Sequence, residues 1–134
     1  MTNEKSVIEF YLDSRSGVAT YMQIVQQVRY ALRLGYLQPG DRLPTIREVV
    51  AKLAINPNTV FKAYRQLEME GLITSHPGLG TFVLHGLEKP LSASLEVLRQ
   101  ELSSWLDKAE ATGLDQESIR ALFLSTIQRK KVRM

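Results

Sequence analysis

Residues 55–71 read INPNTVFKAYRQLEMEG, and this stretch carries the strongest helix signals in the chain. Asn56 is a good N-cap because its side-chain oxygen can accept a hydrogen bond from the free amides of the first turn. Pro57 then falls at the first helical position, where an N–H is not needed, and Gly71 suits the left-handed residue that ends a helix. Apolar residues recur between these signals at the helical spacing i, i+3, i+4 and i+7, namely Val60, Ala63, Tyr64 and Leu67.

The opposite face of this expected helix holds two cations and an amide but no acid. Its residues are Asn58, Phe61, Lys62 and Arg65. A polar face is typical of any solvated helix, and a basic one also suits a helix that enters a DNA groove. The segments on either side must therefore decide between these interpretations.

A second helix is expected immediately before the first. Thr45 and Glu48 form a capping-box pattern at its start, and apolar spacing continues to about Leu53. Two short helices joined by a three-residue turn, here residues 54–56, are typical of a helix-turn-helix. Arg47 lies in the first turn, where a cation opposes the helix dipole. That placement fits a functional arginine and a solvated one equally well.

A further helix is expected over about residues 20–34, followed by a turn-rich connector over 36–44. Residues 7–12 are β-prone and form either a short strand or an extended arm. After Gly71, residues 72–75 and 81–84 read as two strands around a glycine-containing turn, which predicts a β-hairpin. A hairpin in this place is a wing that would reach along DNA, with His76, Gly78 and Gly80 at its turn.

The remainder of the chain predicts a separate helical unit. Leucines and a tryptophan recur at heptad spacing, Gly113 ends this helix, and Asp115 caps the next. Two amphipathic helices leave apolar surface uncovered, so we expect a second copy to cover it; the alternative is that both pack against the first domain. We expect a frayed basic tail over residues 128–134. The expected dimer contacts are Leu95, Leu98, Leu102, Trp105, Leu122 and Phe123.

The composition excludes several classes of protein. The 134 residues are 44% hydrophobic, which is enough for a core. There is no cysteine, so disulfides, thiolate zinc sites and cysteine nucleophiles are excluded. No apolar run is long enough to span a bilayer, and the N-terminus does not resemble a signal peptide, so we expect a cytoplasmic protein. Between Arg29 and Arg65 there are seven cations and two acids, which indicates a polyanionic partner.

The combined pattern resembles a known family. Residues 21–83 are similar to the winged-helix domain of GntR-type bacterial transcriptional regulators, in the segments YMQI, PGDRLPTIREV, NPNTVFKAYRQLEMEGLI and GLGTFV. The short remainder resembles the YtrA-type subfamily, whose small C-terminal unit has two helices and mainly dimerises. We therefore expect a mainly α fold with a small β-hairpin, a winged helix-turn-helix over 1–86, and a two-helix dimerisation unit with a basic tail over 87–134.

The resemblance implies a dimeric repressor, or occasionally an activator, that binds a palindromic operator in double-stranded DNA, in a subfamily often encoded beside transporter genes. By matching position, Arg47 is the base-reading arginine, Asn58 and Thr59 contact bases or phosphates, and Gly78 and Gly80 form the wing turn. Many members have arginine at the positions of Pro57 and Phe61, and this departure shifts weight to Arg47, Asn58 and the remaining cations. The expected DNA-binding set is Thr45, Arg47, Asn58, Thr59, Lys62, Arg65, His76, Gly78 and Gly80.

The side chains suggest what each contact would do. Arg47 can pair with the O6 and N7 atoms of guanine, and Asn58 can do the same with adenine. Thr59, Lys62 and Arg65 suit phosphates. Two rival interpretations are a winged helix that binds protein and an enzyme; for the latter we find no phosphate loop, nucleophile–base set or metal spacing. We expect no cofactor and no metal, and a small-molecule effector is left open without a polar cluster to support it.

Overall fold

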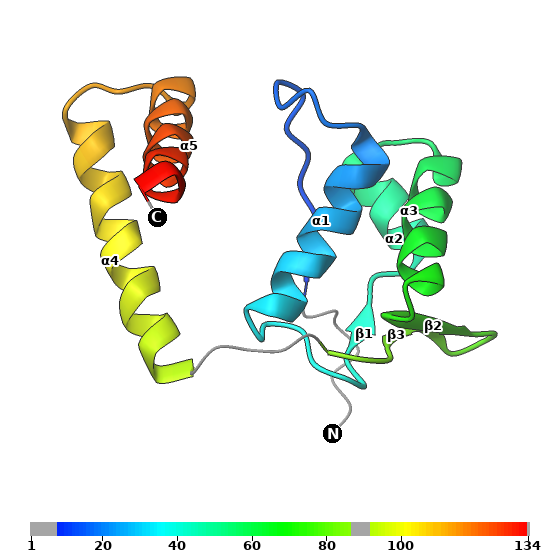
Figure 1. Cartoon of the computed structure of the whole chain (residues 1–134). Coiled ribbons are helices and arrows are strands. Elements are labelled where there is room, and N and C mark those ends of the chain that lie inside the picture. Colours follow the sequence, from blue (N-terminus) through cyan, green and yellow to red (C-terminus); the bar gives the residue numbers. More distant parts are fainter. Residues whose placement is uncertain (1–7, 87–91, 134) are drawn as a thin grey trace. The chain divides into compact units, whose positions relative to one another are not determined.

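The computed structural model describes residues 8–86 and 92–133, which fall in two compact units within Met1–Pro90 and Leu91–Met134. The first unit contains the arm, three helices and a small sheet, and the second contains two helices (Figure 1). The elements in chain order are α1 Thr20–Arg33, β1 Arg42–Leu43, α2 Ile46–Leu53, α3 Pro57–Met69, β2 Ile73–His76, β3 Gly80–Val83, α4 Ser92–Ala111 and α5 Gln116–Arg133.

Helix α3 lies at the centre of the first unit, where it packs against both α1 and α2. The sheet is antiparallel in the order β1-β3-β2, with Ile73 opposite Val83 in the hairpin. The predicted winged helix-turn-helix in a mainly α chain is confirmed by this arrangement. The connector expected over residues 36–44 also contains β1, where Arg42 pairs with Phe82. That two-residue strand exists only because β3 lies beside it, so no local pattern announces it.

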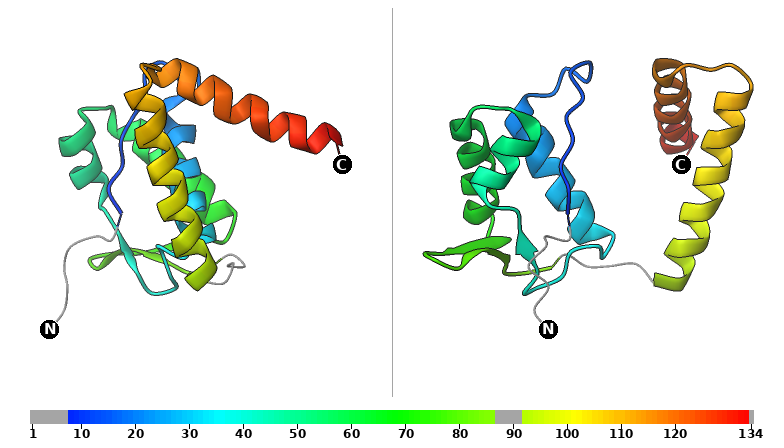
Figure 2. Two further views of the ribbon diagram at one scale, coloured as in Figure 1. Left: turned by 90° about the vertical axis from the view of Figure 1, so that its left-hand side faces the viewer. Right: turned by 180° about the vertical axis from the view of Figure 1, so that it is seen from behind.

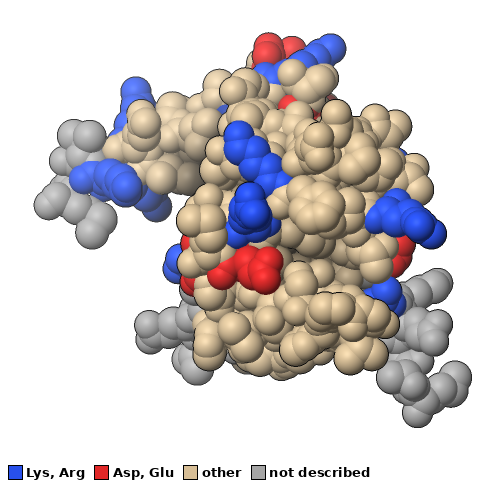
Figure 3. Space-filling view, turned by 90° about the vertical axis from the view of Figure 1, so that its right-hand side faces the viewer, with Lys and Arg blue, Asp and Glu red and all other residues tan. Residues whose placement is uncertain are grey.

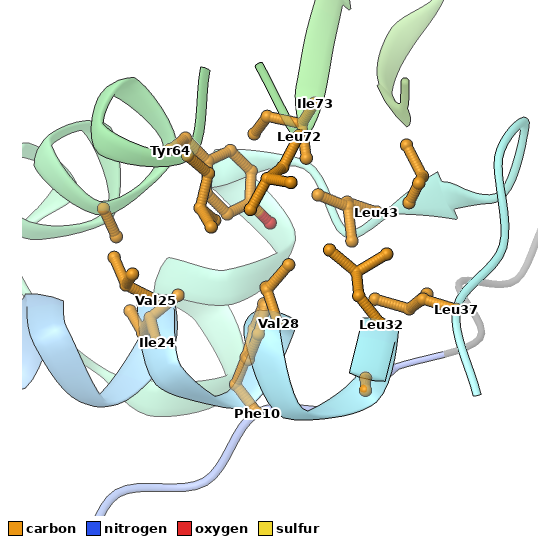
Figure 4. Packing of buried hydrophobic residues seen from close by; sticks show 14 of the residues in the cluster. Phe10, Ile24, Val25, Val28, Leu32, Leu37, Leu43, Tyr64, Leu72 and Ile73 are labelled. Carbon is orange, nitrogen blue, oxygen red and sulfur yellow. The ribbon is translucent and has the colours of Figure 1, made fainter. Parts of the chain in front are cut away.

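The core of the first unit is formed by the apolar faces of α1 and α3 together with residues from the sheet and the arm (Figure 4). The stripe expected on α3 is fully or almost fully buried. Burying such side chains contributes about 1.5–3 kcal/mol each to folding. The largest completely enclosed side chains are Ile24, Leu32, Leu37, Leu43, Leu67 and Ile73, with Val25, Val28 and Val60.

The N-terminal segment is an extended arm rather than a strand. Residues 8–12 belong to no sheet, and Val7 lies outside the described residues. Phe10 is buried in the core, and the backbone of Tyr11 exchanges two hydrogen bonds with the side chain of Gln27 on α1. The arm therefore covers the core from the side of α1 (Figure 4).

In the second unit, α4 and α5 meet near their connecting turn and diverge from it (Figure 2). Ala109 and Ile119, both close to the turn, are the buried apolar residues of the described part of this unit. Asp115 caps α5 by accepting a hydrogen bond from the amide of Ser118, as expected. Farther from the turn most of the apolar side chains are exposed, among them Leu98, Leu102 and Ile127, so the two helices form an open V.

The expected frayed tail over residues 128–134 is a wrong prediction for the described residues. Helix α5 continues to Arg133, and Met134 lies outside the described residues. Lysine, arginine and glutamine are good helix formers, and cations near the C-terminal end interact favourably with the helix dipole. The basic sequence is therefore compatible with a helix to its last turn.

Candidate nucleic-acid interface

The start of α2 is fixed by the predicted capping box. The hydroxyl of Thr45 accepts a 3.1 Å hydrogen bond from the amide of Glu48, and the amide of Thr45 donates to the Glu48 carboxylate at 3.3 Å. Thr45 is the N-cap, so the helix itself begins at Ile46. Arg47 lies in the first turn with its side chain exposed. Its guanidinium forms no hydrogen bond or ion pair with any described residue, so it is available to a partner.

The turn between the two helices depends on Ala54, whose φ of 53° is left-handed although the residue is not glycine. Tyr64 adds a polar contact to the packing of α3. Its hydroxyl donates a buried 2.6 Å hydrogen bond to the carbonyl of Pro44, just before α2. Burial raises the pKa of Tyr64, with a smaller contribution from the nearby Glu48 carboxylate, so the hydroxyl keeps its proton. This contact ties α3 to the start of α2.

The outward face of α3 is the surface that the sequence predicted. Asn58, Phe61, Lys62 and Arg65 are all exposed. Asn56 caps the helix by accepting a hydrogen bond from the backbone amide of Asn58 at 2.8 Å. The side-chain amide of Asn58 forms no hydrogen bond with a described residue. No described residue forms a hydrogen bond or ion pair with the Arg65 side chain either. The side chains of Asn58 and Arg65 are therefore exposed and available to an anionic surface.

Two of the expected residues are less free than their neighbours on α3. Thr59 is half-buried. Lys62 extends over the ring of Tyr21 near the start of α1, with its ammonium nitrogen 4.0 Å from the ring centroid. Such a cation–π contact is worth about 0.5–1 kcal/mol at an exposed site. This contact favours one direction of the Lys62 side chain.

Arg29 belongs to the basic sequence segment but serves a structural role. Its guanidinium forms a bidentate hydrogen-bonded ion pair with the Glu70 carboxylate, which joins α1 to the end of α3. The hydrogen bond from Arg29 lowers the pKa of Glu70 below its ordinary value, and a second hydrogen bond from Gln66 acts in the same direction. The charge of Arg29 is therefore neutralised within the domain.

The wing is a tight hairpin between β2 and β3. The amide of Leu79 donates to the carbonyl of His76 at 2.9 Å, and Gly78 has a φ of 79° at the turn. His76 is exposed, and its ring lies against Phe82 with centroids 5.8 Å apart. Gly80 has a φ of 124°, and a Cβ there would come within 3.3 Å of Nε of Arg42. Gly80 therefore has a packing role as well as a turn role.

Seen from the side of α3 and the hairpin, lysine and arginine side chains flank a broad uncharged area, and acidic atoms take up little of the surface (Figure 3). Among the exposed apolar side chains of these elements are Phe61, at 61%, and Leu79, at 72%. The described surface of these elements therefore carries both cationic and apolar side chains. Such a surface suits a polyanion that also offers apolar groups.

The sequence missed two residues that organise this face. Tyr21 positions Lys62, and Arg42 contacts both Glu48 at 3.3 Å and the wing at Gly80. Both contacts join segments distant in sequence, so neither spacing nor composition could reveal them. Among the described residues, no group of three or more histidine, cysteine, aspartate or glutamate side chains could hold a metal ion. No helix in the described ranges is long and apolar enough to cross a membrane.

Comparison with known proteins shows which proteins this chain resembles. The family model described as bacterial regulatory proteins, gntR family, matches residues 20–83. The chain is 34% identical over 109 residues to the HTH-type transcriptional repressor YtrA of Bacillus subtilis, a match that covers 81% of this chain and 84% of that protein.

Solved structures give the same result. A transcriptional antiterminator from Listeria monocytogenes EGD-e superposes with a TM-score of 0.58 at 31% identity, covering 92% of this chain and 93% of that one. YtrA from Sulfolobus acidocaldarius, a GntR-family transcription factor, superposes with a TM-score of 0.51 at 32% identity, covering 75% and 96%. The chain therefore belongs to the GntR family of bacterial regulatory proteins, with YtrA-type relatives, and is a DNA-binding transcriptional regulator rather than an enzyme.

Proposed function

We propose that this regulator is a dimeric repressor that binds a palindromic operator through two copies of its winged helix-turn-helix, residues 1–86. The observation that supports this most strongly is the outward face of α2 and α3, where Arg47, Asn58 and Arg65 are exposed and unpaired among the described residues. Groups of this kind bind phosphates and base edges in the major groove. Cytoplasmic DNA is the expected partner, and the proposal requires no cofactor or small-molecule effector.

Two residues are proposed to read bases. Arg47 would donate two hydrogen bonds to the O6 and N7 atoms of a guanine, a contact worth about 1–3 kcal/mol of discrimination. Asn58 would pair in the same manner with an adenine. Both lie in the first turns of their helices, and the N-terminal part of the second helix of this motif usually contacts the bases. Neither side chain must break a contact within the domain to do so.

The remaining residues are proposed to bind and orient the DNA backbone. Lys62 and Arg65 would contact phosphates, with Lys62 already oriented by Tyr21, and Thr59 would take part from the edge of the face. His76, Gly78 and Gly80 would bring the wing to the adjacent groove. Thr45 would contribute through the cap that sets Arg47 in place. Contacts of this kind set affinity and salt dependence more than sequence preference.

The second unit, residues 87–134, is proposed to join two copies. Between α4 and α5 lies an apolar groove of about 390 Å³ whose walls include Leu102, Trp105, Leu122 and Phe123. Trp105 and Phe123 face each other across it, with ring centroids 6.5 Å apart. Leu98 is 60% exposed, and Leu95 is half-buried on the same helix. Exposed apolar side chains in this number mark an interaction surface, and a second copy would cover it symmetrically.

Two experiments test this proposal: selection of a DNA binding site, and measurement of the mass of the protein alone and on DNA. The full chain would select duplexes from a random pool, and sedimentation would give the mass of the protein alone and on the selected duplex. We expect inverted half-sites about one DNA turn apart, roughly 34 Å, and two chains per duplex. We expect such sites to lie near transporter genes, which would be the targets of this regulator.

These experiments distinguish failure of dimerisation from failure of operator binding. A selected site without inverted symmetry, bound by one chain, would reject the dimer and leave the DNA-binding assignment intact. Selection of no sequence would reject the operator. The runner-up, a winged helix that binds a protein, is favoured by the exposed Phe61 and Leu79; it would gain only in that second case.

A further inference from the structure

Phe61 is the least expected side chain on the DNA-facing surface of α3. It lies in the second turn of the helix, with 61% of its surface exposed and no ring partner among the described residues. Leaving a phenylalanine in water forgoes about 1.5–3 kcal/mol of burial energy. A solvated helix face has no need of such a residue. The exposed ring is therefore available to a partner that covers it.

The surroundings of Phe61 indicate what that partner is. Pro57, one turn earlier and on the same side of the helix, is also exposed, so the two form an apolar strip at the N-terminal half of α3. Asn58 and Arg65 lie next to this strip and carry unused hydrogen-bonding groups. A strip framed by a cation and an amide, with no acid beside it, complements a base edge in DNA better than an apolar protein surface.

The major groove offers one apolar group to such a strip, the C5-methyl group of thymine, which is a known partner of phenylalanine. We propose that the ring of Phe61 contacts a thymine methyl group in each half-site and so specifies an A·T pair at that position. This inference rests on the proposed operator binding and deepens it. It gives the helix an apolar base contact alongside the polar contacts of Arg47 and Asn58.

The experiment replaces each thymine of the selected duplex in turn by deoxyuridine, which removes only the methyl group. Binding of the full chain is measured by fluorescence anisotropy. In each half-site we expect one thymine whose replacement by deoxyuridine weakens binding about fourfold. This is the effect expected when one buried methyl group is lost. Replacement of the same thymine by 5-bromodeoxyuridine, whose bromine is similar in size to a methyl group, should restore the affinity.

The variant Phe61→Ala identifies the side chain responsible. It should bind thymine and deoxyuridine equally at that position, because the methyl group has lost its partner. Phe61 contributes little to the core, and alanine favours the helix, so the variant should keep the wild-type unfolding midpoint. Met69→Ala is the matched control, since Met69 is 77% exposed at the far end of the same helix. This control should keep the full penalty for deoxyuridine.

The outcomes that overturn the inference are distinct from failure of operator binding. If the wild type binds the selected duplex tightly and no thymine replacement changes the affinity, the methyl contact does not exist. If Phe61→Ala shows the same penalty as the wild type, another residue makes that contact. If the wild type selects no sequence at all, the proposed function fails first and this inference fails with it.

Discussion

The hydroxyl of Tyr64 lies 2.6 Å from the carbonyl oxygen of Pro44 in the buried interior of the first unit, and this hydrogen bond joins α3 to the chain just before α2. Tyr64 is a core residue of α3, on the side opposite its exposed face. This hydrogen bond therefore adds one polar contact to the apolar packing that orients the two helices of the motif.

Tyr64→Phe should lower the free energy of unfolding by about 1–2 kcal/mol, because the Pro44 carbonyl loses its partner while staying buried. Urea denaturation followed by circular dichroism measures this. Tyr30→Phe is the matched control, since Tyr30 is 59% exposed, and it should leave the midpoint unchanged. Equal stability of Tyr64→Phe and the wild type would show that the hydrogen bond contributes nothing net.

The Arg29–Glu70 pair predicts a defined pH dependence of stability. Hydrogen bonding from Arg29 lowers the pKa of Glu70 in the folded state below its value of 4.5 for the free group. The stabilisation is therefore complete above that ordinary pKa and is lost as the pH falls through the lower folded value. Because both side chains are partly exposed, at 38% and 27%, we expect only about 0.5 kcal/mol.

Glu70→Gln should show this loss at pH 7 and converge with the wild type as the pH falls below the folded pKa of Glu70. Chemical denaturation at several pH values measures the difference. Glu68→Gln, two residues earlier and exposed, should match the wild type throughout. A deficit for Glu70→Gln that persisted undiminished in acid would contradict the ion-pair explanation.

The two wing glycines should respond differently to alanine. At Gly80 a side chain meets both a φ of 124° and the Arg42 guanidinium at 3.3 Å, whereas at Gly78 the φ is 79° and the space is open. Gly78→Ala should cost about 1–2 kcal/mol for the left-handed backbone, and Gly80→Ala should cost more than that. Thermal unfolding of both variants gives the order, and the reverse order would contradict the described hairpin.

The groove between α4 and α5 predicts the effect of a buried charge. Phe123→Glu would place a carboxylate among Leu102, Trp105 and Leu122, and the cost of burying it should favour the monomer. Sedimentation velocity would show a fall in mass at concentrations where the wild type is a dimer. Leu124→Glu is the control, because Leu124 is exposed and does not line the groove. Dissociation by both variants alike would move the dimer contact elsewhere.

The sequence predicted the parts of this fold that depend on local signals. The caps at Thr45, Asn56 and Asp115 are confirmed, because a cap needs only residues within one turn. The apolar stripe of α3 is confirmed for the same reason. The contacts that were missed are between segments far apart in the chain. Strand β1 exists through its pairing with β3, and Lys62 is oriented by Tyr21 from another helix.

Two further differences come from competition between signals. Ala54 takes a left-handed conformation that its side chain disfavours, because the turn between α2 and α3 needs it. The cluster of positive charges at the C-terminal end predicts a frayed tail. Its residues are also good helix formers, however, and α5 continues to Arg133. The roles of Arg47, Asn58 and the wing in DNA recognition stay predictions, since they depend on a partner outside the chain.

Titration of the selected duplex with wild type and Arg47→Ala, beside a scrambled duplex and at several salt concentrations, tests the central claim most directly. We expect the wild type to prefer its own site by about a thousandfold or more. Arg47→Ala should lose most of this preference and keep weak, salt-sensitive binding to both duplexes, because the phosphate contacts remain. An Arg47→Ala variant that kept the full preference, or a wild type that bound neither duplex at low salt, would contradict the proposed interface.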